Sequence, residues 1–358
     1  MPESYSFGVD PISCHSWNKE RNQIAISLNS NEVEIHGFSG GRWTLKETLT
    51  DHAQRITGID WSPKSNQIVT CAADRNAHVW TLTDGKWKPA LVVLGITRAA
   101  TCVKWSPEGN KFAVGSGNRS VSVCYFDSMN DWWTNKKIKK PIRSTITCLD
   151  WHKNNQLLAC GSTDFKARVY SASMKEVNES PSPTSWGSKL TFANLLAEFP
   201  TEGGGWIHGI SFSGSGDKLA WVGHDSSICV ADSAKGNLLT IVKTEYLPFV
   251  DITWTSETAL VVAGYDCVPL SYTYNNGAIT FKAKIDADNK QTETKKGGAM
   301  AHFRTQDTRG TTDNSDTTLN SIHQNTITQI SIHSGTKDKC AKFSTTAADG
   351  QLVIWDCK

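Results

Sequence analysis

The segment Ile56-Thr-Gly-Ile-Asp-Trp61-Ser-Pro63 decides the fold, because copies of it recur along the whole chain. Its pattern predicts a short strand that ends at proline, because proline cannot donate a hydrogen bond to a strand ladder. Seven copies of one supersecondary unit are therefore predicted. The other copies are Ile12-Ser-Cys-His-Ser-Trp17, Ala100-Thr-Cys-Val-Lys-Trp105, Ile146-Thr-Cys-Leu-Asp-Trp151, Ile207-His-Gly-Ile-Ser-Phe212, Val250-Asp-Ile-Thr-Trp254 and Ile327-Thr-Gln-Ile-Ser-Ile332.

The spacing of the copies predicts the architecture. The anchor residues that end these strands are Trp17, Trp61, Trp105, Trp151, Phe212, Trp254 and Ile332, so consecutive anchors lie 44, 44, 46, 61, 42 and 78 residues apart. The shorter spacings match the period of about 40–45 residues that is typical of WD-type blades, each a four-stranded sheet. We therefore predict an all-β, seven-bladed WD40 β-propeller in which residues 1–358 form a single domain.

A ring of blades also has to be closed, because one blade cannot bury both of its faces alone. We expect a strand near Ser4–Val9 to pair with the strand around Gln351–Asp356, so that the two ends of the chain share one blade.

Polar residues recur at fixed places in the repeat. Asp74 lies 13 residues after Trp61, in the turn between the second and third strands of its unit. With His52, Thr70 and Trp80 it can form a buried hydrogen-bond chain that rigidifies the blade. We interpret these four residues as structural and not as catalytic. The same structural role is predicted for Asp164, Asp225, Asp349 and Trp355.

The sequence favours no catalytic, cofactor or metal site. Cys14, Cys102 and Cys148 each lie three residues before a repeat anchor, so they are equivalent core positions and not a cluster. No Cys-x-x-Cys or His-Glu-x-x-His pattern occurs, and no glycine-rich stretch has the Gly-Lys-Ser/Thr ending of a phosphate-binding loop. Catalysis at the funnel would need convergent acids or histidines, and none is evident.

The charge and the composition restrict the partners and the compartment. Lys+Arg minus Asp+Glu is 37 − 35 = +2, which gives no support for nucleic-acid or membrane binding. The first ten residues contain neither a basic start nor an apolar stretch, so we expect no signal peptide and a cytosolic or nuclear protein. The 10 cysteines are then expected to be free thiols.

The segment Asp131–Arg143 is interpreted as a loop after the third blade and carries two candidate features, Trp132-Trp133 and a run of lysines. Successive side chains of a strand alternate in direction, so both tryptophans cannot face one core. One tryptophan could pack between blades while the lysines form a solvated face. Alternatively, the segment is a docking patch for an acidic or aromatic partner surface. The candidate protein-binding residues are Trp132, Trp133, Lys136, Lys137, Lys139 and Lys140.

Two long spacings indicate insertions, at about residues 172–205 and 286–318. The first contains Trp186, Leu190 and Phe199, so we expect it to pack on the rim of the propeller or to complete a blade edge. The second is polar, with Met300 and Phe303 as its only large apolar residues. It is interpreted either as a disordered insertion without a role or as a short helix, Ala299–Gln306, that binds a partner.

These features together resemble one family. The blades, the Trp132–Ser144 segment, the stretch Pro183-Thr-Ser-Trp-Gly-Ser-Lys189 and the polar sixth-blade insertion are similar to the WD-repeat subunit of the actin-related protein 2/3 complex, which nucleates branched actin filaments. The resemblance covers essentially the whole chain. The fifth and seventh blades lack the tryptophan anchor, and the third has Asn118 in place of aspartate.

The resemblance implies a non-enzymatic scaffold in a seven-protein assembly, located in the cytoplasm at the cortical actin cytoskeleton. Its implied partners are the actin-related and small structural subunits and the mother filament, which Met300, Phe303 and Arg304 would contact. Nucleation-promoting factors are a further candidate class of partner. The alternative interpretation is a WD40 adaptor of another assembly, of the ubiquitin-ligase or chromatin type.

Overall fold

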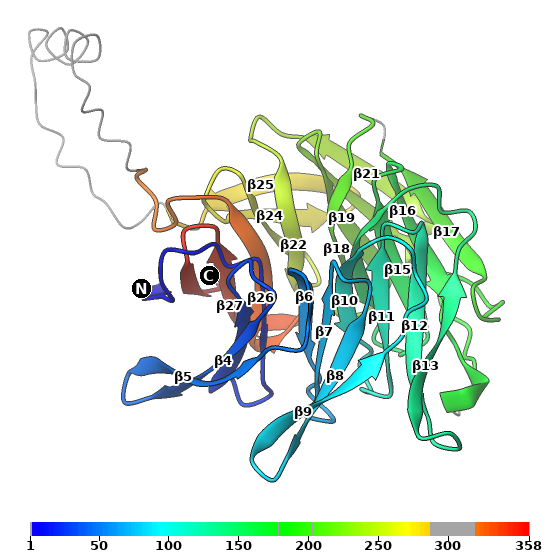
Figure 1. Ribbon diagram of the computed structural model, residues 1–358. Coiled ribbons are helices and arrows are strands. Elements are labelled where there is room, and N and C mark those ends of the chain that lie inside the picture. Colours follow the sequence, from blue (N-terminus) through cyan, green and yellow to red (C-terminus); the bar gives the residue numbers. More distant parts are fainter. Residues whose placement is uncertain (1, 178, 202, 287–318, 358) are drawn as a thin grey trace, which may run out of the picture.

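The computed structural model describes residues 2–177, 179–201, 203–286 and 319–357, and its strands form a ring of seven antiparallel blades (Figure 1). The predicted all-β propeller is therefore confirmed. Among the described residues the only helices are two 3₁₀ turns, η1 (Lys175–Val177) and η2 (Ser233–Lys235). None of the described helices has the length and apolar character needed to cross a membrane.

In blades one to six, the strands run in sequence order from the centre of the ring to its rim. Blade one is β2 (Cys14–Trp17), β3 (Gln23–Ser27), β4 (Val33–Ser39) and β5 (Arg42–Leu49). Blade two is β6 (Ile56–Trp61), β7 (Ile68–Ala72), β8 (Ala77–Thr83) and β9 (Lys86–Val92). Blade three is β10 (Ala100–Trp105), β11 (Lys111–Ser116), β12 (Ser120–Asp127) and β13 (Trp132–Ile138). Blade four is β14 (Ile146–Trp151), β15 (Leu157–Ser162), β16 (Lys166–Ser171) and β17 (Leu195–Pro200).

Blades five and six continue this order, whereas blade seven takes its outermost strand, β1, from the start of the chain. Blade five is β18 (Ile207–Phe212), β19 (Lys218–Gly223), β20 (Ser227–Asp232) and β21 (Leu238–Lys243). Blade six is β22 (Phe249–Ser256), β23 (Ala259–Gly264), β24 (Leu270–Asn275) and β25 (Ala278–Lys284). Blade seven is β26 (Ile327–Thr336), β27 (Lys339–Ala347), β28 (Gln351–Asp356) and β1 (Glu3–Ser6). The sheets of blades six and seven share one bridge pair between β22 and β27, Ser256 with Lys339.

The ring is closed by the pairing that the sequence predicts. Strand β1 lies antiparallel to β28, with Ser4 opposite Val353 and Tyr5 opposite Leu352. In Figure 1 the two ends of the chain accordingly lie side by side. The outermost strand of blade seven therefore comes from the start of the chain, so opening the ring requires breaking this pairing.

The hydrophobic core lies between neighbouring blades, because each blade has two apolar faces. Two glycines of the second strands show how closely the blades approach. A Cβ atom on Gly115 would lie 2.6 Å from the side chain of Ile146, and one on Gly161 would lie 2.4 Å from that of Ile207. Both isoleucines begin the innermost strand of the next blade. Glycine is thus required at these positions for close stacking.

Polar side chains of the innermost strands tie each blade to the next one. Five of them accept a backbone N–H from the following blade, at 2.6–2.9 Å. These bonds fix the blade order around the ring and satisfy backbone groups that stacking removes from water. The acceptors and their donors are Ser16 with Trp61, Asp60 with Trp105, Asp150 with Phe212, Asp251 with Ile330, and Gln329 with His15.

The region around residues 172–205 packs on the fourth blade and supplies its outermost strand, β17. Trp186 is buried against Phe199 and Phe212, and its indole N–H donates to the carbonyl of Gly216 at 2.8 Å. The last part of the region is regular blade structure, because it forms β17. The inserted segment, which we call the extra chain, therefore consists of the residues between β16 and β17.

A buried ion pair holds this extra chain to blade three. Glu179 accepts hydrogen bonds from the Lys111 ammonium and the Asn155 amide, and the Lys111 side chain is fully buried. Burial lowers the pKa of Lys111, although its bond to Glu179 acts in the opposite direction. Gln156 adds a bond to the carbonyl of Ser180 at 2.7 Å. The segment is therefore held by charge and hydrogen bonds as well as by apolar packing.

Candidate protein-binding surface

The polar set predicted in blade two forms a continuous hydrogen-bond chain. Trp80 donates its indole N–H to the Thr70 hydroxyl at 3.0 Å, and that hydroxyl lies 2.8 Å from Nε2 of His52. Nδ1 of His52 lies 2.8 Å from a carboxylate oxygen of Asp74. The chain is satisfied when a neutral His52 carries its proton on Nδ1. Each polar group is then used inside the blade.

The same chain occurs in blade seven, where it links Trp355, Thr345, His323 and Asp349. Asp349 and Trp355 were predicted from the sequence, whereas His323 and Thr345 were not. A usable signal existed, since Thr345, Asp349 and Trp355 repeat the spacing of Thr70, Asp74 and Trp80. The histidine lies 26 residues before the aspartate instead of 22, because β26 and β27 are longer and contain bulges.

The other two predicted turn aspartates have different partners. Asp164 forms an ion pair with buried Arg168 at 2.9 Å and accepts the backbone N–H of Arg143. Asp225 accepts the hydroxyl of Ser227 at 2.6 Å. Both turns are thus stabilised without a histidine.

The tryptophan pair lies on a strand and not on the expected loop, since β13 is the outermost strand of blade three. Trp133 points inward and packs on Trp105 and Phe112, with ring centroids 5.8 and 5.2 Å away. Trp132 points outward and is 63% exposed. It is next to the hairpin tip, where Met129 is 94% exposed. The alternation of a strand therefore separates the two rings.

The four lysines are separated in the same way. Lys136 forms an ion pair with Glu176 and Lys137 donates to the carbonyl of Gly95 at 2.6 Å, so both hold neighbouring segments of the chain. Lys139 and Lys140 follow the end of β13 and are exposed. Trp132 begins the strand, so it lies about 23 Å from these two lysines at 3.3 Å per residue. The candidate residues of this segment therefore do not form one patch.

Lys139 and Lys140 belong to a larger group of exposed cations, which we call the basic surface. Its members lie in the loops that lead into the innermost strands of blades two to four and in the adjoining turns. Backbone bonds such as Gly117 N–H to the Ala99 carbonyl bring these loops and turns together. In the described part of the chain, no carboxylate lies within ion-pair distance of these cations. The basic surface consists of Arg55, Arg75, Arg98, Arg119, Lys139, Lys140 and Arg143.

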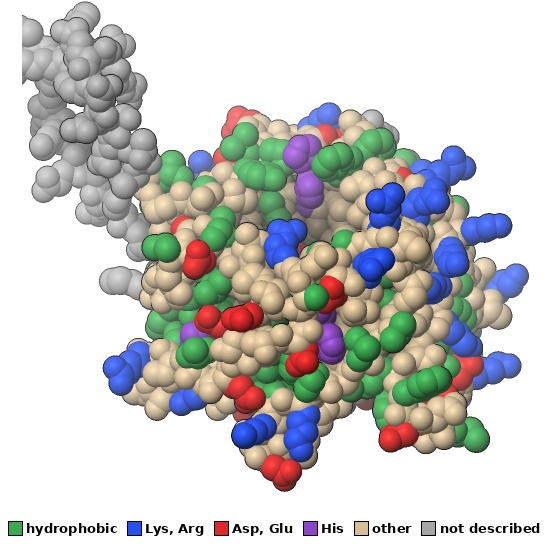
Figure 2. All heavy atoms as spheres, viewed as in Figure 1, with side chains coloured by type: hydrophobic (Ala, Val, Ile, Leu, Met, Phe, Trp, Pro, Cys, Tyr) green, Lys and Arg blue, Asp and Glu red, His purple; other side chains and the backbone are tan. Residues whose placement is uncertain are grey.

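A positive surface of this kind is not evident from the net charge, because the whole chain carries only +2. In the view of Figure 2, Lys and Arg side chains are numerous over blades three and four, on the right of the molecule. Clustered charges of one sign attract a partner of the opposite sign and raise its rate of association. The basic surface is therefore suited to an acidic protein surface.

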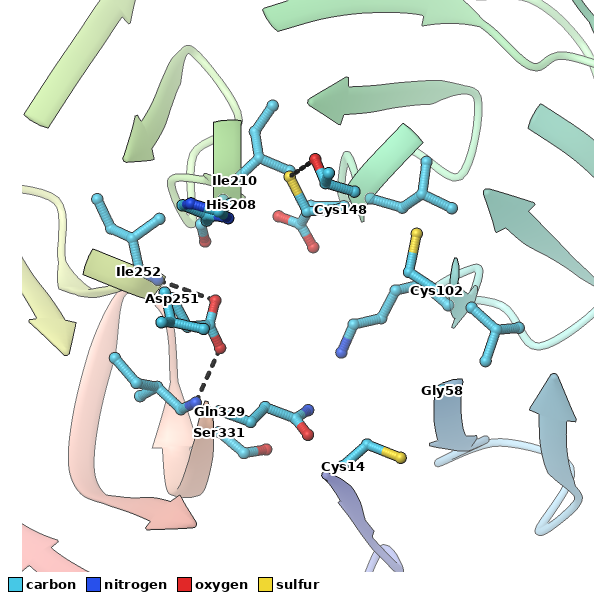
Figure 3. Close-up of a pocket in the computed structure, with 18 of the residues that line it drawn as sticks. Cys14, Gly58, Cys102, Cys148, His208, Ile210, Asp251, Ile252, Gln329 and Ser331 are labelled. Atoms are coloured by element: carbon cyan, nitrogen blue, oxygen red, sulfur yellow. Dashed lines mark hydrogen bonds between the residues drawn. The ribbon is translucent and has the colours of Figure 1, made fainter. Parts of the chain in front are cut away.

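The central cavity corrects one expectation, because acids and a histidine do converge there. Asp150, Asp251 and His208 line a cavity of about 550 Å³ together with Lys104 and Lys337. Figure 3 shows Asp251 bonded to the backbone of a neighbouring strand. The residues come from different blades, so their convergence leaves no local sequence pattern.

These cavity groups are nevertheless engaged in structural contacts. Asp150 and Asp251 accept the backbone bonds between blades that are described above, and Asp150 also forms an ion pair with Lys337 at 2.6 Å. Burial raises the pKa of Asp251 to about 6. Carboxylates that accept backbone N–H groups are held in place by those bonds and are already satisfied.

Cys14, Cys102 and Cys148 were predicted to be equivalent core positions. They lie on separate strands, and each of them also lines this central cavity (Figure 3). Among the residues that the structure describes, no group of three or more His, Cys, Asp or Glu side chains could hold a metal ion. All 10 cysteines are free thiols in the structure.

The second candidate binding segment belongs to the connection between blades six and seven. Met300, Phe303, Arg304 and the short helix expected at 299–306 lie outside the described residues. The described chain leaves blade six after β25 and returns at Leu319, ahead of β26.

Known proteins match three of the blades as a repeat family and nearly the whole chain as relatives. The family model described as WD domain, G-beta repeat matches residues 43–81, 90–124 and 136–171. Actin-related protein 2/3 complex subunit 1A-A of Xenopus laevis is 55% identical over 356 residues, which cover 99% of this chain and 96% of the relative. Subunit 1 of that complex from Schizosaccharomyces pombe is 40% identical, with 95% of each chain covered. Subunit 1B from Arabidopsis thaliana is 36% identical, with 97% and 94% covered.

The repeated blades and the matching family model define a WD-repeat β-propeller. Within that class, the full-length identities are high enough to assign the family directly. The chain belongs to the family of subunit 1 of the actin-related protein 2/3 complex.

Proposed function

We propose that this protein is a non-catalytic scaffold subunit of an actin-nucleating complex of the actin-related protein 2/3 type. The observation that carries the proposal is the 55% identity to subunit 1A-A over 99% of this chain. The geometry supports it, because the conspicuous polar groups of the blades and of the central cavity are used within the propeller. We further propose that the protein acts in the cytoplasm, at the cortical actin cytoskeleton, and that its partners are the actin-related and small structural subunits.

Within this function we propose that the basic surface contacts an acidic surface of another subunit or of a nucleation-promoting factor. Lys139 and Lys140 are its most prominent members, because they are adjacent and exposed. We assign no partner contact to Lys136, Lys137 and Trp133, since their side chains are engaged within the chain. Trp132 belongs to a separate apolar tip with Met129.

The test is co-purification of the tagged chain with its partners from cells. The unmodified chain is expected to bring down actin-related proteins. The double variant Lys139→Glu and Lys140→Glu is expected to recover about tenfold less of the subunit or factor that the surface contacts, since like charges then meet across the interface. The loss should be larger at low salt, where screening is weaker.

The matched control reverses two other exposed lysines, Lys64→Glu and Lys88→Glu, which are 59% and 60% exposed and lie outside the basic surface. Recovery equal to that of the unmodified chain is expected for this control. Equal losses in both double variants would refute a specific role of the basic surface. Recovery of a ubiquitin-ligase or chromatin assembly instead of actin-related proteins would favour the alternative, a WD40 adaptor of another assembly.

We also propose that the segment between blades six and seven contacts the mother filament through Met300, Phe303 and Arg304. The proposal rests on the family and on the composition of the segment, which is polar apart from two large apolar side chains. Apolar residues isolated in a polar segment are typical anchors of a linear binding motif.

The double variant Met300→Ala and Phe303→Ala is expected to lower branch formation about tenfold in a reconstituted assay, because each apolar anchor contributes about 1 kcal/mol or more. Assembly with the other subunits should be unchanged, which co-purification measures. The variant Gln291→Ala with Thr292→Ala, in the same segment, is the matched control. Branch formation that equals the unmodified level in the Met300/Phe303 variant would eliminate the filament contact.

A further inference from the structure

Two cysteines of blade seven lie in contact with each other. Cys340 is in β27 and Cys357 directly follows β28, and their sulfur atoms are 3.0 Å apart. The backbone N–H of Cys357 donates to the carbonyl of Ala341 at 2.9 Å. This bond pairs Cys357 with the residue next to Cys340, so the two cysteines lie at the end of the β27–β28 hairpin with their sulfur atoms in contact.

The pair differs chemically from the other thiols of the chain. Burial raises the pKa of Cys14 and of Cys160 to about 12, so these thiols stay protonated and unreactive near neutral pH. The pKa of Cys357 is lowered, because the Cys340 thiol can donate a hydrogen bond to its thiolate. Cys357 is thus the favoured nucleophile of the pair. The Cys340 sulfur is close enough to react with an oxidised Cys357.

The Cys357 thiol is also accessible. Its side chain is half-buried and lines a cavity of about 340 Å³ between blades six and seven, whose wall includes Val261, Phe343 and Trp355. A hydrogen peroxide molecule is not much larger than water, so it can enter such a space. The cavity is separate from the central one and from the basic surface.

We propose that Cys340 and Cys357 form an oxidisable dithiol site, which a peroxide converts into an intrachain disulfide. In the first step the Cys357 thiolate attacks one oxygen of hydrogen peroxide, the O–O bond breaks, and hydroxide leaves and takes up a proton as water. In the second step the Cys340 sulfur attacks the Cys357 sulfenic acid, the S–S bond forms, and a second water leaves. Two thiols are oxidised and one peroxide is reduced to two waters.

The location gives this site a structural consequence. Strand β28 carries β1 on its other edge, so β27, β28 and β1 are the strands that close the ring. A disulfide between Cys340 and Cys357 spans 17 residues and joins the two sides of the β27–β28 hairpin. Such a link restricts the unfolded chain and opposes separation of β27 from β28, the strand on which β1 pairs. Oxidation is therefore expected to raise the melting temperature.

The test treats the full chain, alone and in its complex, with a low excess of hydrogen peroxide and then alkylates it under denaturing conditions. Two of the 10 cysteines are expected to become resistant to alkylation, and a reducing agent should restore both. After tryptic digestion without reduction, the peptide Cys340–Lys342 should be found linked to the peptide 343–358 by mass spectrometry.

Single variants separate the two steps. With Cys340→Ser, the Cys357 sulfenic acid should persist and react with dimedone, and no linked peptide should form. With Cys357→Ser, the peroxide should have no effect on alkylation at this site. The variant Cys267→Ser, a cysteine of a blade-six turn, serves as the matched control and should form the link normally. Ten alkylated cysteines after treatment, or prior oxidation of other cysteines, would overturn the proposal.

Discussion

Replacing Glu179 by alanine is expected to lower the free energy of unfolding by about 3–5 kcal/mol, which is the usual cost of removing one partner of a buried ion pair. The variant leaves the Lys111 ammonium without its carboxylate, and the Lys111 side chain is fully buried. It also removes an acceptor from Asn155 and from the backbone N–H of Met174. Urea denaturation monitored by tryptophan fluorescence measures the loss.

Two further variants isolate the cause of this loss. The double variant Lys111→Met with Glu179→Leu removes both charges, so it should recover most of the lost stability, to within about 1–2 kcal/mol. The exposed pair of Lys64 and Glu108 is the matched control, and Glu108→Ala should cost less than about 1 kcal/mol. A Glu179→Ala loss as small as that of Glu108→Ala would show that the ion pair does not hold the extra chain of blade four.

Replacing Asp74 by alanine is expected to lower the free energy of unfolding by about 2–3 kcal/mol, because hydrogen bonds to a buried charged group are lost together. The carboxylate accepts from His52 and from the backbone N–H groups of Ala53 and Asn76. The bond that orients His52 toward Thr70 is then lost as well. Asp349→Ala should have a similar effect in blade seven, and thermal or urea denaturation measures both.

The pH dependence of this contribution has a definite sign. Burial alone would raise the pKa of Asp74, but its hydrogen bonds outweigh burial and the pKa lies below the ordinary value of 3.8. The stabilisation is therefore fully present above about pH 4 and is lost as the pH falls through the folded-state pKa. The difference between the unmodified chain and Asp74→Asn should accordingly shrink only in strong acid.

Asp84→Asn is the matched control in the same blade, because asparagine also tolerates the left-handed backbone of this turn residue (φ 55°). The Asp84 side chain is 89% exposed in the β8–β9 turn, and its ion pair with Lys88 is open to water. A change of less than about 0.5 kcal/mol is expected. A loss for Asp74→Ala no greater than that for Asp84→Asn would contradict the structural role of the hydrogen-bond chain.

Local sequence patterns were sufficient for the fold. The strand repeats, the regular distance from anchor to turn and the pairing of the first strand with the last follow from strand periodicity and from the need to close a ring, whereas the register of Ser4 with Val353 was not predicted. The hydrogen-bond chain of blade two could also be predicted, because its four residues keep the spacing of a known blade signature. The corresponding chain in blade seven could be predicted only in part, since the longer strands of that blade displace His323 from that spacing.

The candidate site was much less predictable. Trp132 and Lys140 are close in sequence, but a strand lies between them and places them at opposite ends of a blade. The opposite holds for Arg55 and Arg143, which are far apart in sequence but lie in equivalent loops, which lead into the innermost strands of blades two and four. A positive cluster assembled from several loops leaves no charge run in the sequence.

By itself, the sequence determined that this protein is a closed ring of seven WD-type blades, because the direction of a side chain along a strand depends only on its nearest neighbours. Only the tertiary structure decided which groups meet across blades. The pair of Lys111 with Glu179, the pair of Cys340 with Cys357, and the convergence of Asp150 and Asp251 each join residues from different strands or blades. Such contacts depend on how the blades stack around the axis, and no local pattern records that stacking.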